Sequence, residues 1–95
     1  MMQNYSVLMS VYFKEKPEYL RQAIESMLCQ TVQTDDFVLV CDGPLTADLN
    51  EVIAEYKDNP IFHLVRLKEN VGIGLAANIG IEHCKNDLIA KMDSD

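Results

Sequence analysis

Apolar residues follow two alternating patterns along the chain. Four short, mostly apolar runs, at positions 5–13, 37–41, 61–67 and 88–92, predict strands; the first is rich in β-branched and aromatic residues, and the first two are expected to be buried on both faces. Between the runs, apolar residues recur every three or four positions, which predicts three amphipathic helices. Strands that alternate with helices form a parallel sheet through right-handed crossovers. The pattern therefore predicts an α/β three-layer sandwich with a four-stranded parallel sheet, in the order β-α-β-α-β-α-β.

The predicted helices each show one apolar face and a recognisable start. Pro17 suits the first turn of the first helix, because its missing N–H costs nothing there, and Thr46 is a suitable N-cap for the second. Gly72 and Gly74 open the third. The predicted buried faces are Leu20, Ala23, Ile24, Met27 and Leu28; Leu49, Val52, Ile53 and Tyr56; and Ile73, Ala76, Ala77, Gly80, Ile81 and Cys84.

Polar residues gather where the predicted strands end. In an open parallel sheet, ligands bind beyond the carboxyl ends of the strands. Taken singly, Asp-Gly and Asn-Val-Gly are ordinary turn sequences, so it is their place after strands that makes them candidates. In chain order the candidate residues are Ser10 and Tyr12, Asp42 with Gly43, Asn70 with Gly72, and Asp93 with Asp95.

The final pair of carboxylates suggests a metal site. Asp93 and Asp95 are two residues apart, directly after a strand, and positions two apart in a strand lie on the same face. Carboxylate oxygens suit Mg²⁺ or Mn²⁺, which typically takes one or two carboxylates together with substrate phosphates. The expected cofactor is therefore Mn²⁺ or Mg²⁺, bridging an acidic protein and a diphosphate.

A second pattern competes with this interpretation. Gly72, Gly74 and Ala77 form G-x-G-x-x-A after a strand, and Asp93 lies 19 residues beyond Gly74, near the spacing of a ribose-binding acid in dinucleotide folds. However, that fingerprint normally follows the first strand of its domain. The same small residues also permit close packing of a helix on a sheet. A dinucleotide-dependent oxidoreductase and a non-catalytic α/β interaction domain both remain open alternatives.

Histidines and cysteines add no second chemistry. Neither His63 nor His83 falls at a strand end, so both are expected to be structural. Three cysteines without a C-x-x-C pair favour free thiols in a reducing cytoplasm over a disulfide framework. Neither a signal peptide nor an apolar run long enough to span a bilayer is recognisable.

Length and charge narrow the possible partners. Ninety-five residues make one domain at most, and 15 acidic against 8 basic residues give a net charge of −7. Such a charge argues against nucleic acid, whose binders need a basic patch, and against anionic lipid. An anionic ligand would need a metal ion or aimed backbone N–H groups.

Taken together, these segments resemble the N-terminal, nucleotide-sugar-binding half of family 2 glycosyltransferases of the GT-A fold. The likeness covers essentially all 95 residues. It rests on the opening strand 5–13, on Ser-x-Leu-x-Gln-Thr in the first helix, on Asp42-Gly43 after the second strand, and on the stretch 70–95 with its D-x-D. The chain departs from the family pattern at Phe13, Cys41, Pro44 and Ala77, where Asn, Asp, Ser and a basic residue are frequent.

The resemblance implies a Rossmann-like sheet in strand order 3-2-1-4 and a role for each candidate residue. Ser10 and Tyr12 would border the base-and-ribose pocket, and Asp42 would accept a hydrogen bond from the base. Asp93 would face the ribose and Asp95 would ligate the metal. Asn70, Gly72 and Asn78 belong to the matching approach to the D-x-D, and are counted with the donor-binding residues.

The resemblance also implies the function. Residues 1–95 would form a nucleotide-sugar-binding subdomain, truncated at the D-x-D, of an inverting glycosyltransferase whose general base lies elsewhere. A UDP-sugar is the expected donor, and a glycan or lipid-linked glycan the expected acceptor. Strand four would be an exposed edge, which leaves pairing with a second copy open. A cytoplasmic location is expected, with membrane association of a full-length parent left open.

Overall fold

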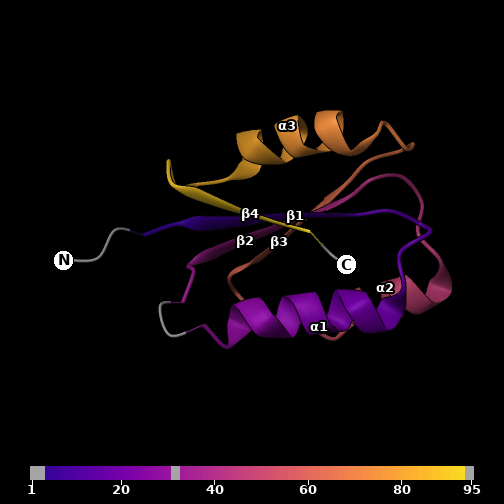
Figure 1. Ribbon diagram of the computed structural model, residues 1–95, viewed down its shortest axis with the longest axis horizontal. Coiled ribbons are helices and arrows are strands. Elements are labelled where there is room, and N and C mark those ends of the chain that lie inside the picture. Colours follow the sequence, from indigo (N-terminus) through magenta and orange to yellow (C-terminus); the bar gives the residue numbers. More distant parts are fainter. Residues whose placement is uncertain (1–3, 31–32, 94–95) are drawn as a thin grey trace.

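The structure, a computed structural model, describes residues 4–30 and 33–93 and confirms the predicted α/β architecture. Helices α1 and α2 lie on one face of the sheet and α3 on the other, which gives three layers (Figure 1). The elements in chain order are β1 (Ser6–Val11), α1 (Pro17–Leu28), β2 (Asp36–Cys41), α2 (Ala47–Ala54), β3 (Phe62–Arg66), α3 (Ile73–His83) and β4 (Ile89–Asp93).

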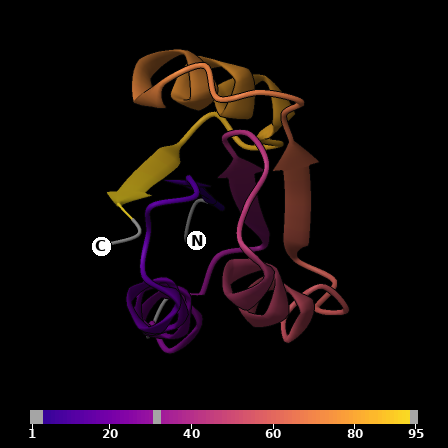
Figure 2. The ribbon, with the colours of Figure 1, turned by 90° about the vertical axis from the view of Figure 1, so that its right-hand side faces the viewer.

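The four strands form one parallel sheet in the order β3-β2-β1-β4, as the resemblance implied. β1 is central, with Ser10 level with Val40 of β2 on one side and with Asp93 of β4 on the other. Figure 2 shows β4 and β3 at opposite edges of the sheet. Within the described residues β4 pairs only with β1, so its other edge is open, as predicted.

The helices cover the two faces in different ways. The α1/α2 face carries the larger core, in which Phe37, Leu20 and Leu49 are fully buried. On the other face, α3 approaches β1 and β2 closely, because a Cβ at Gly80 would collide with Leu8 and come within 2.7 Å of Val40 Cγ2. The expectation that small residues allow close packing of this helix is confirmed.

Two predicted apolar segments were drawn too widely. β1 ends at Val11, which pairs with the last residue of β2, and the next two residues have no strand partner. Tyr12 and Phe13 are consequently 41% and 47% exposed instead of buried. On α3, Ile73 and Ile81 are exposed.

The exposure of Ile81 follows from helix geometry, and that of Ile73 from its place as the first residue of α3, before the part of the helix that is buried. Ile73 opens α3 one turn before Ala76, the first residue buried against the sheet. Ile81 follows the buried Gly80 and is therefore turned about 100° away from it. Ile79, which was not predicted on the packed face, contacts instead the α3-side core, the buried cluster of Leu8, Val38, Val40, Val65, Ala76 and Ala77.

A buried hydrogen-bond network fixes the start of β4. The hydroxyl of Ser6 donates to Asp36 Oδ2 at 2.7 Å, and the backbone N–H of Lys85 donates to the same oxygen at 2.8 Å. The backbone N–H of Asn86 donates to Ser6 Oγ at 3.1 Å. These bonds join the amino-terminal ends of β1 and β2 to the segment before β4, so they help to set the register of β4 against β1.

Candidate functional site at the carboxyl ends of the strands

Asp42, the first residue after β2, is the best-defined member of the site. It is 4% exposed, and its two carboxylate oxygens accept hydrogen bonds from two successive backbone N–H groups, Val71 at 2.7 Å and Gly72 at 3.1 Å. The side-chain amide of Asn70 donates to the backbone carbonyl of Asp42 at 3.2 Å. The carboxylate therefore holds the loop that leads into α3.

The glycines on either side of this contact are required by their geometry. Gly43 has φ +90°, and a Cβ there would lie 2.7 Å from the backbone nitrogen of Asn70. Gly72 has φ +95° and is the N-cap residue of α3. Both values favour glycine, because residues with a Cβ rarely adopt positive φ. The two turn sequences thus form one interlocked unit that links the ends of β2 and β3.

The carboxylate of Asp42 keeps capacity for a further partner. Each of its oxygens has two lone pairs and uses one for a backbone N–H. Because both oxygens are already oriented by the loop, an additional N–H donor would meet an acceptor that needs no reorganisation. The predicted contact with a base is compatible with this arrangement, although in the structure the partners of Asp42 are protein groups.

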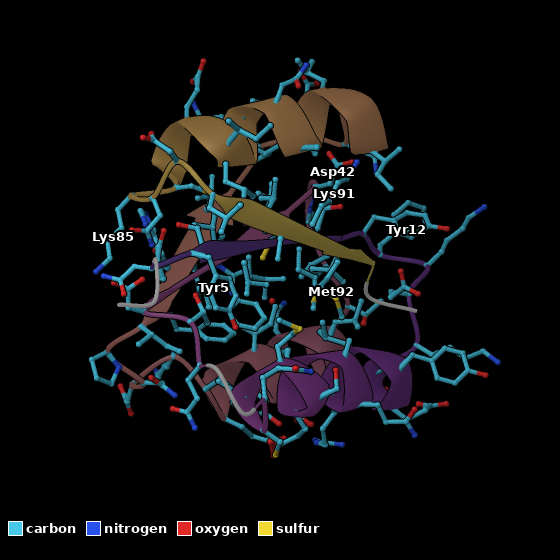
Figure 3. The ribbon with its side chains drawn as sticks, turned by 60° about the vertical axis from the view of Figure 1, so that its left-hand side comes forward. Tyr5, Tyr12, Asp42, Lys85, Lys91 and Met92 are labelled. Carbon is cyan, nitrogen blue, oxygen red and sulfur yellow. The ribbon has the colours of Figure 1, made fainter. Side chains whose placement is uncertain are left out.

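Ser10 and Tyr12 lie at the same end of the sheet. Leu8 and Val40 belong to the α3-side core, and Ser10 is level with Val40, so Ser10 is on the α3 side of β1. Figure 3 shows Tyr12 and Asp42 toward the same end of the sheet. The Tyr12 ring packs edge-to-face against Phe13, with centroids 5.9 Å apart. An exposed aromatic ring and a half-buried hydroxyl thus flank the carboxyl end of β1.

Of the remaining predicted residues, the structure places Asn78 and the backbone of Asp93. Asn78 is exposed on α3, turned away from the face that Ala76, Ala77 and Gly80 bury. Asp93 ends β4 at the level of Ser10, and Asp95 lies outside the described residues. Among the side chains that the structure describes, which do not include that of Asp93, no group of three or more His, Cys, Asp or Glu could hold a metal ion. The metal assignment to Asp93 and Asp95 stays a prediction, and its two carboxylates have the ligand chemistry that Mg²⁺ and Mn²⁺ prefer.

The competing G-x-G-x-x-A pattern is accounted for by packing. Gly72 supplies the positive φ at the start of α3, and Ala77 is buried against the sheet. Gly74 has nothing within 4 Å of where a Cβ would be. The helix also follows β3, an edge strand, whereas a dinucleotide fingerprint follows the first strand of its domain.

Cys41 and the two histidines lie apart from this candidate site. Burial raises the pKa of the Cys41 thiol, despite the opposing charge of Arg66, so the thiol stays protonated and packs in the core. His63 of β3 and His83 of α3 are both exposed, with their rings edge-to-face and their centroids 5.3 Å apart, away from the strand ends that carry Asp42 and Ser10.

Sequence patterns missed the partner of Asp42. The two bonds to Val71 and Gly72 span 29 and 30 residues and end on backbone N–H groups, which every residue except proline carries. The available signal was the pairing of a D-G with an N-x-G at the ends of two strands that neighbour each other in the sheet.

Comparison with solved structures places this geometry in a known fold. The structure of S. aureus TarS 1-349 in complex with UDP-GlcNAc matches 98% of the chain with a TM-score of 0.82 at 22% identity, over 27% of that chain. The mannosyltransferase PcManGT from Pyrobaculum calidifontis, in complex with GDP-Man and Mn²⁺, matches 97% with a TM-score of 0.82 at 16% identity, over 27% of that chain. These likenesses establish the GT-A fold.

Proteins related in sequence are glycosyltransferases by name. An uncharacterized glycosyltransferase of Haemophilus influenzae is 46% identical over 96% of the chain, and the UDP-Gal:alpha-D-GlcNAc-diphosphoundecaprenol beta-1,3-galactosyltransferase of Escherichia coli is 36% identical over 96%. The chain spans 34% and 33% of the length of these two relatives. Residues 6–95 match the family described as Glycosyl transferase family 2, and the chain belongs to that family.

Proposed function

We propose that this chain is the donor-binding part of an inverting glycosyltransferase. It binds a nucleoside diphosphate sugar at the carboxyl ends of β1, β2 and β4, together with Mn²⁺ or Mg²⁺. The observation that carries the proposal is the interlock of Asp42 with the loop before α3, at the end of the sheet where Ser10 is level with Asp93. Family membership supports sugar transfer over the oxidoreductase and interaction-domain alternatives.

The nucleoside would be recognised by groups already in place. The exposed ring of Tyr12 offers an apolar surface with a hydroxyl for the base and ribose, and Ser10 offers a second hydroxyl. Asp42 would accept a hydrogen bond from a base N–H with its remaining lone pairs. A UDP-sugar is the proposed donor, which the complex of TarS with UDP-GlcNAc supports.

The diphosphate would be held through the metal. Asp93 and Asp95 would be its protein ligands, and the divalent ion would stabilise the negative charge that develops on the leaving nucleoside diphosphate. The net charge of −7 opposes the approach of an anionic donor, and a bound divalent cation would offset this repulsion. The Mn²⁺ in the PcManGT complex supports this choice.

The acceptor and location are proposed from the relatives. The Escherichia coli relative is named for transfer to a GlcNAc-diphosphoundecaprenol, so a lipid-linked glycan is the proposed acceptor. Binding of that acceptor and the general base are assigned to segments that correspond to the remaining length of the relatives. Of the described helices, none is long and apolar enough to cross a membrane. A cytoplasmic location remains part of the proposal.

Calorimetric titration of the chain tests the proposal. UDP-galactose, UDP-GlcNAc and GDP-mannose are titrated with Mg²⁺ and with EDTA, and NAD⁺ is titrated alongside. The proposal expects at least one nucleotide sugar to bind, with a loss of affinity in EDTA, and NAD⁺ to bind more weakly than that nucleotide sugar. Tight binding of NAD⁺ without nucleotide-sugar binding would favour the oxidoreductase instead.

A further inference from the structure

Lys91 occupies a distinctive position on β4. It is level with Leu8, which belongs to the α3-side core, so Lys91 is on the α3 side of the sheet. The next residue, Met92, packs against the α1/α2 core on the opposite face. Figure 3 shows Lys91 directed from β4 toward the α3 side and Met92 toward α1. Lys91 is exposed, because β4 is an edge strand and α3 covers β1 and β2.

The position of Lys91 gives it access to the proposed diphosphate. Lys91 precedes Asp93 by two residues, which is about 6.6 Å along a strand. A lysine ammonium sits on a flexible four-carbon stem and reaches about 6 Å from its Cα. The ammonium can therefore meet a ligand that lies over the ends of β1 and β4, where Ser10 is level with Asp93.

No other strand residue brings a positive charge to this face among those the structure describes. Arg66 ends β3 at the level of Cys41, which belongs to the α1/α2 core, and its guanidinium donates to Asn50 of α2 at 3.1 Å. The residues that α3 buries against the sheet are uncharged. Asp42 lies at this end of the sheet and adds negative charge.

We infer that Lys91 binds the phosphate groups of the donor directly, as a cation additional to the metal. The inference rests on the proposed function, and it gives a role to a residue that takes part in neither the proposed metal site nor the proposed nucleoside contacts. A divalent ion neutralises only part of a diphosphate that is surrounded by several carboxylates. The exposed ammonium of Lys91 neutralises part of the remaining negative charge of the diphosphate, and its contribution to the binding free energy falls as the salt concentration rises.

Binding of uridine, UMP and UDP in Mg²⁺ tests the inference on four chains: wild type, Lys91→Met, Lys91→Arg and Lys57→Met. Lys57 is exposed after α2, at the opposite end of the sheet from Asp42, and Lys57→Met removes the same charge as Lys91→Met. We expect Lys91→Met to weaken UDP binding about three- to tenfold and to leave uridine binding unchanged, the range of one exposed charge pair to phosphate. Lys91→Arg should retain most of the affinity, and Lys57→Met should match wild type.

The outcomes separate the inference from the function on which it rests. Wild-type binding of UDP with an unchanged Lys91→Met affinity overturns the role of Lys91 and leaves the proposed function standing. An equal loss for uridine and UDP also overturns it, since a phosphate contact cannot act on uridine. GDP is titrated into wild type as well, and if wild type binds neither UDP nor GDP in Mg²⁺, both the proposed function and the role of Lys91 fail. A salt dependence of UDP binding that is shallower in Lys91→Met than in wild type supports the inference.

Discussion

Replacing Asp42 by asparagine should loosen the loop before α3. The carboxylate accepts two backbone N–H bonds, at 2.7 Å from Val71 and 3.1 Å from Gly72, and an amide has only one oxygen to offer. In Asp42→Asn, one N–H loses its acceptor and faces an NH₂ group instead. Because Asp42 is buried, we expect the free energy of unfolding to fall by about 1–3 kcal/mol, the cost of an unmet buried donor.

Hydrogen exchange locates this effect, and urea unfolding measures it. The amides of Val71 and Gly72 should exchange faster in Asp42→Asn, whereas amides of β1 should change only by the global loss of stability. Asp58→Asn is the matched control, since Asp58 is exposed after α2 and its change should be close to neutral. Nucleotide binding should weaken by about 1–3 kcal/mol as well, because the same carboxylate is the proposed acceptor for the base.

Two results would refute this reasoning. Unchanged exchange at Val71 and Gly72 would mean that the carboxylate does not hold the loop. Full nucleotide affinity in Asp42→Asn, together with the loss of stability, would reduce Asp42 to a structural turn residue.

Three further predictions follow from other parts of the molecule. Gly80→Val should lower the free energy of unfolding in urea by about 2–3 kcal/mol, since α3 has no room for a side chain there, and an unchanged midpoint would contradict the close packing. The hydrogen bond from Arg21 lowers the pKa of Glu55, so the Arg21–Glu55 pair stabilises the fold above the ordinary glutamate pKa and ceases to do so as pH falls through the lowered value. In Glu55→Gln the free energy of unfolding should therefore depend less on pH in the acid range, and an unchanged pH dependence there would refute this. Asp95→Ala should abolish the dependence of donor binding on Mn²⁺ and Asp93→Ala should leave part of it, as measured by titration with and without EDTA. If Asp93→Ala abolishes the dependence and Asp95→Ala leaves part of it, Asp93 and not Asp95 is the main metal ligand.

The order and type of the elements could be predicted because each segment has one dominant period. Continuous apolar runs and a three-to-four spacing separate strands from helices without ambiguity in most of this chain. The strand order could not be predicted in this way, because periodicity does not say which strands are neighbours. It came from the family resemblance, which the structure confirms.

The errors and omissions have a common physical origin in tertiary contacts. α3 is apolar on several sides, so its sequence alone could not exclude Ile73 and Ile81 from the packed face. The β1 run continues into Tyr12 although the neighbouring strand ends one residue earlier. Asp42 was predicted as a site residue from its place after β2, but its bond to the backbone of Val71 depends on β3 lying beside β2.

The central claim is that a nucleoside diphosphate and a divalent ion bind together at the carboxyl ends of β1, β2 and β4. Paramagnetic relaxation by Mn²⁺ in the presence of UDP, recorded on the backbone amides of the chain, tests it most directly. The account predicts that the amides of Ser10, Asp42 and Met92 broaden while those of Ser6 and Lys85, at the other end of the sheet, stay sharp. Broadening that is centred on Ser6 and Lys85, or that is the same without UDP, would contradict it.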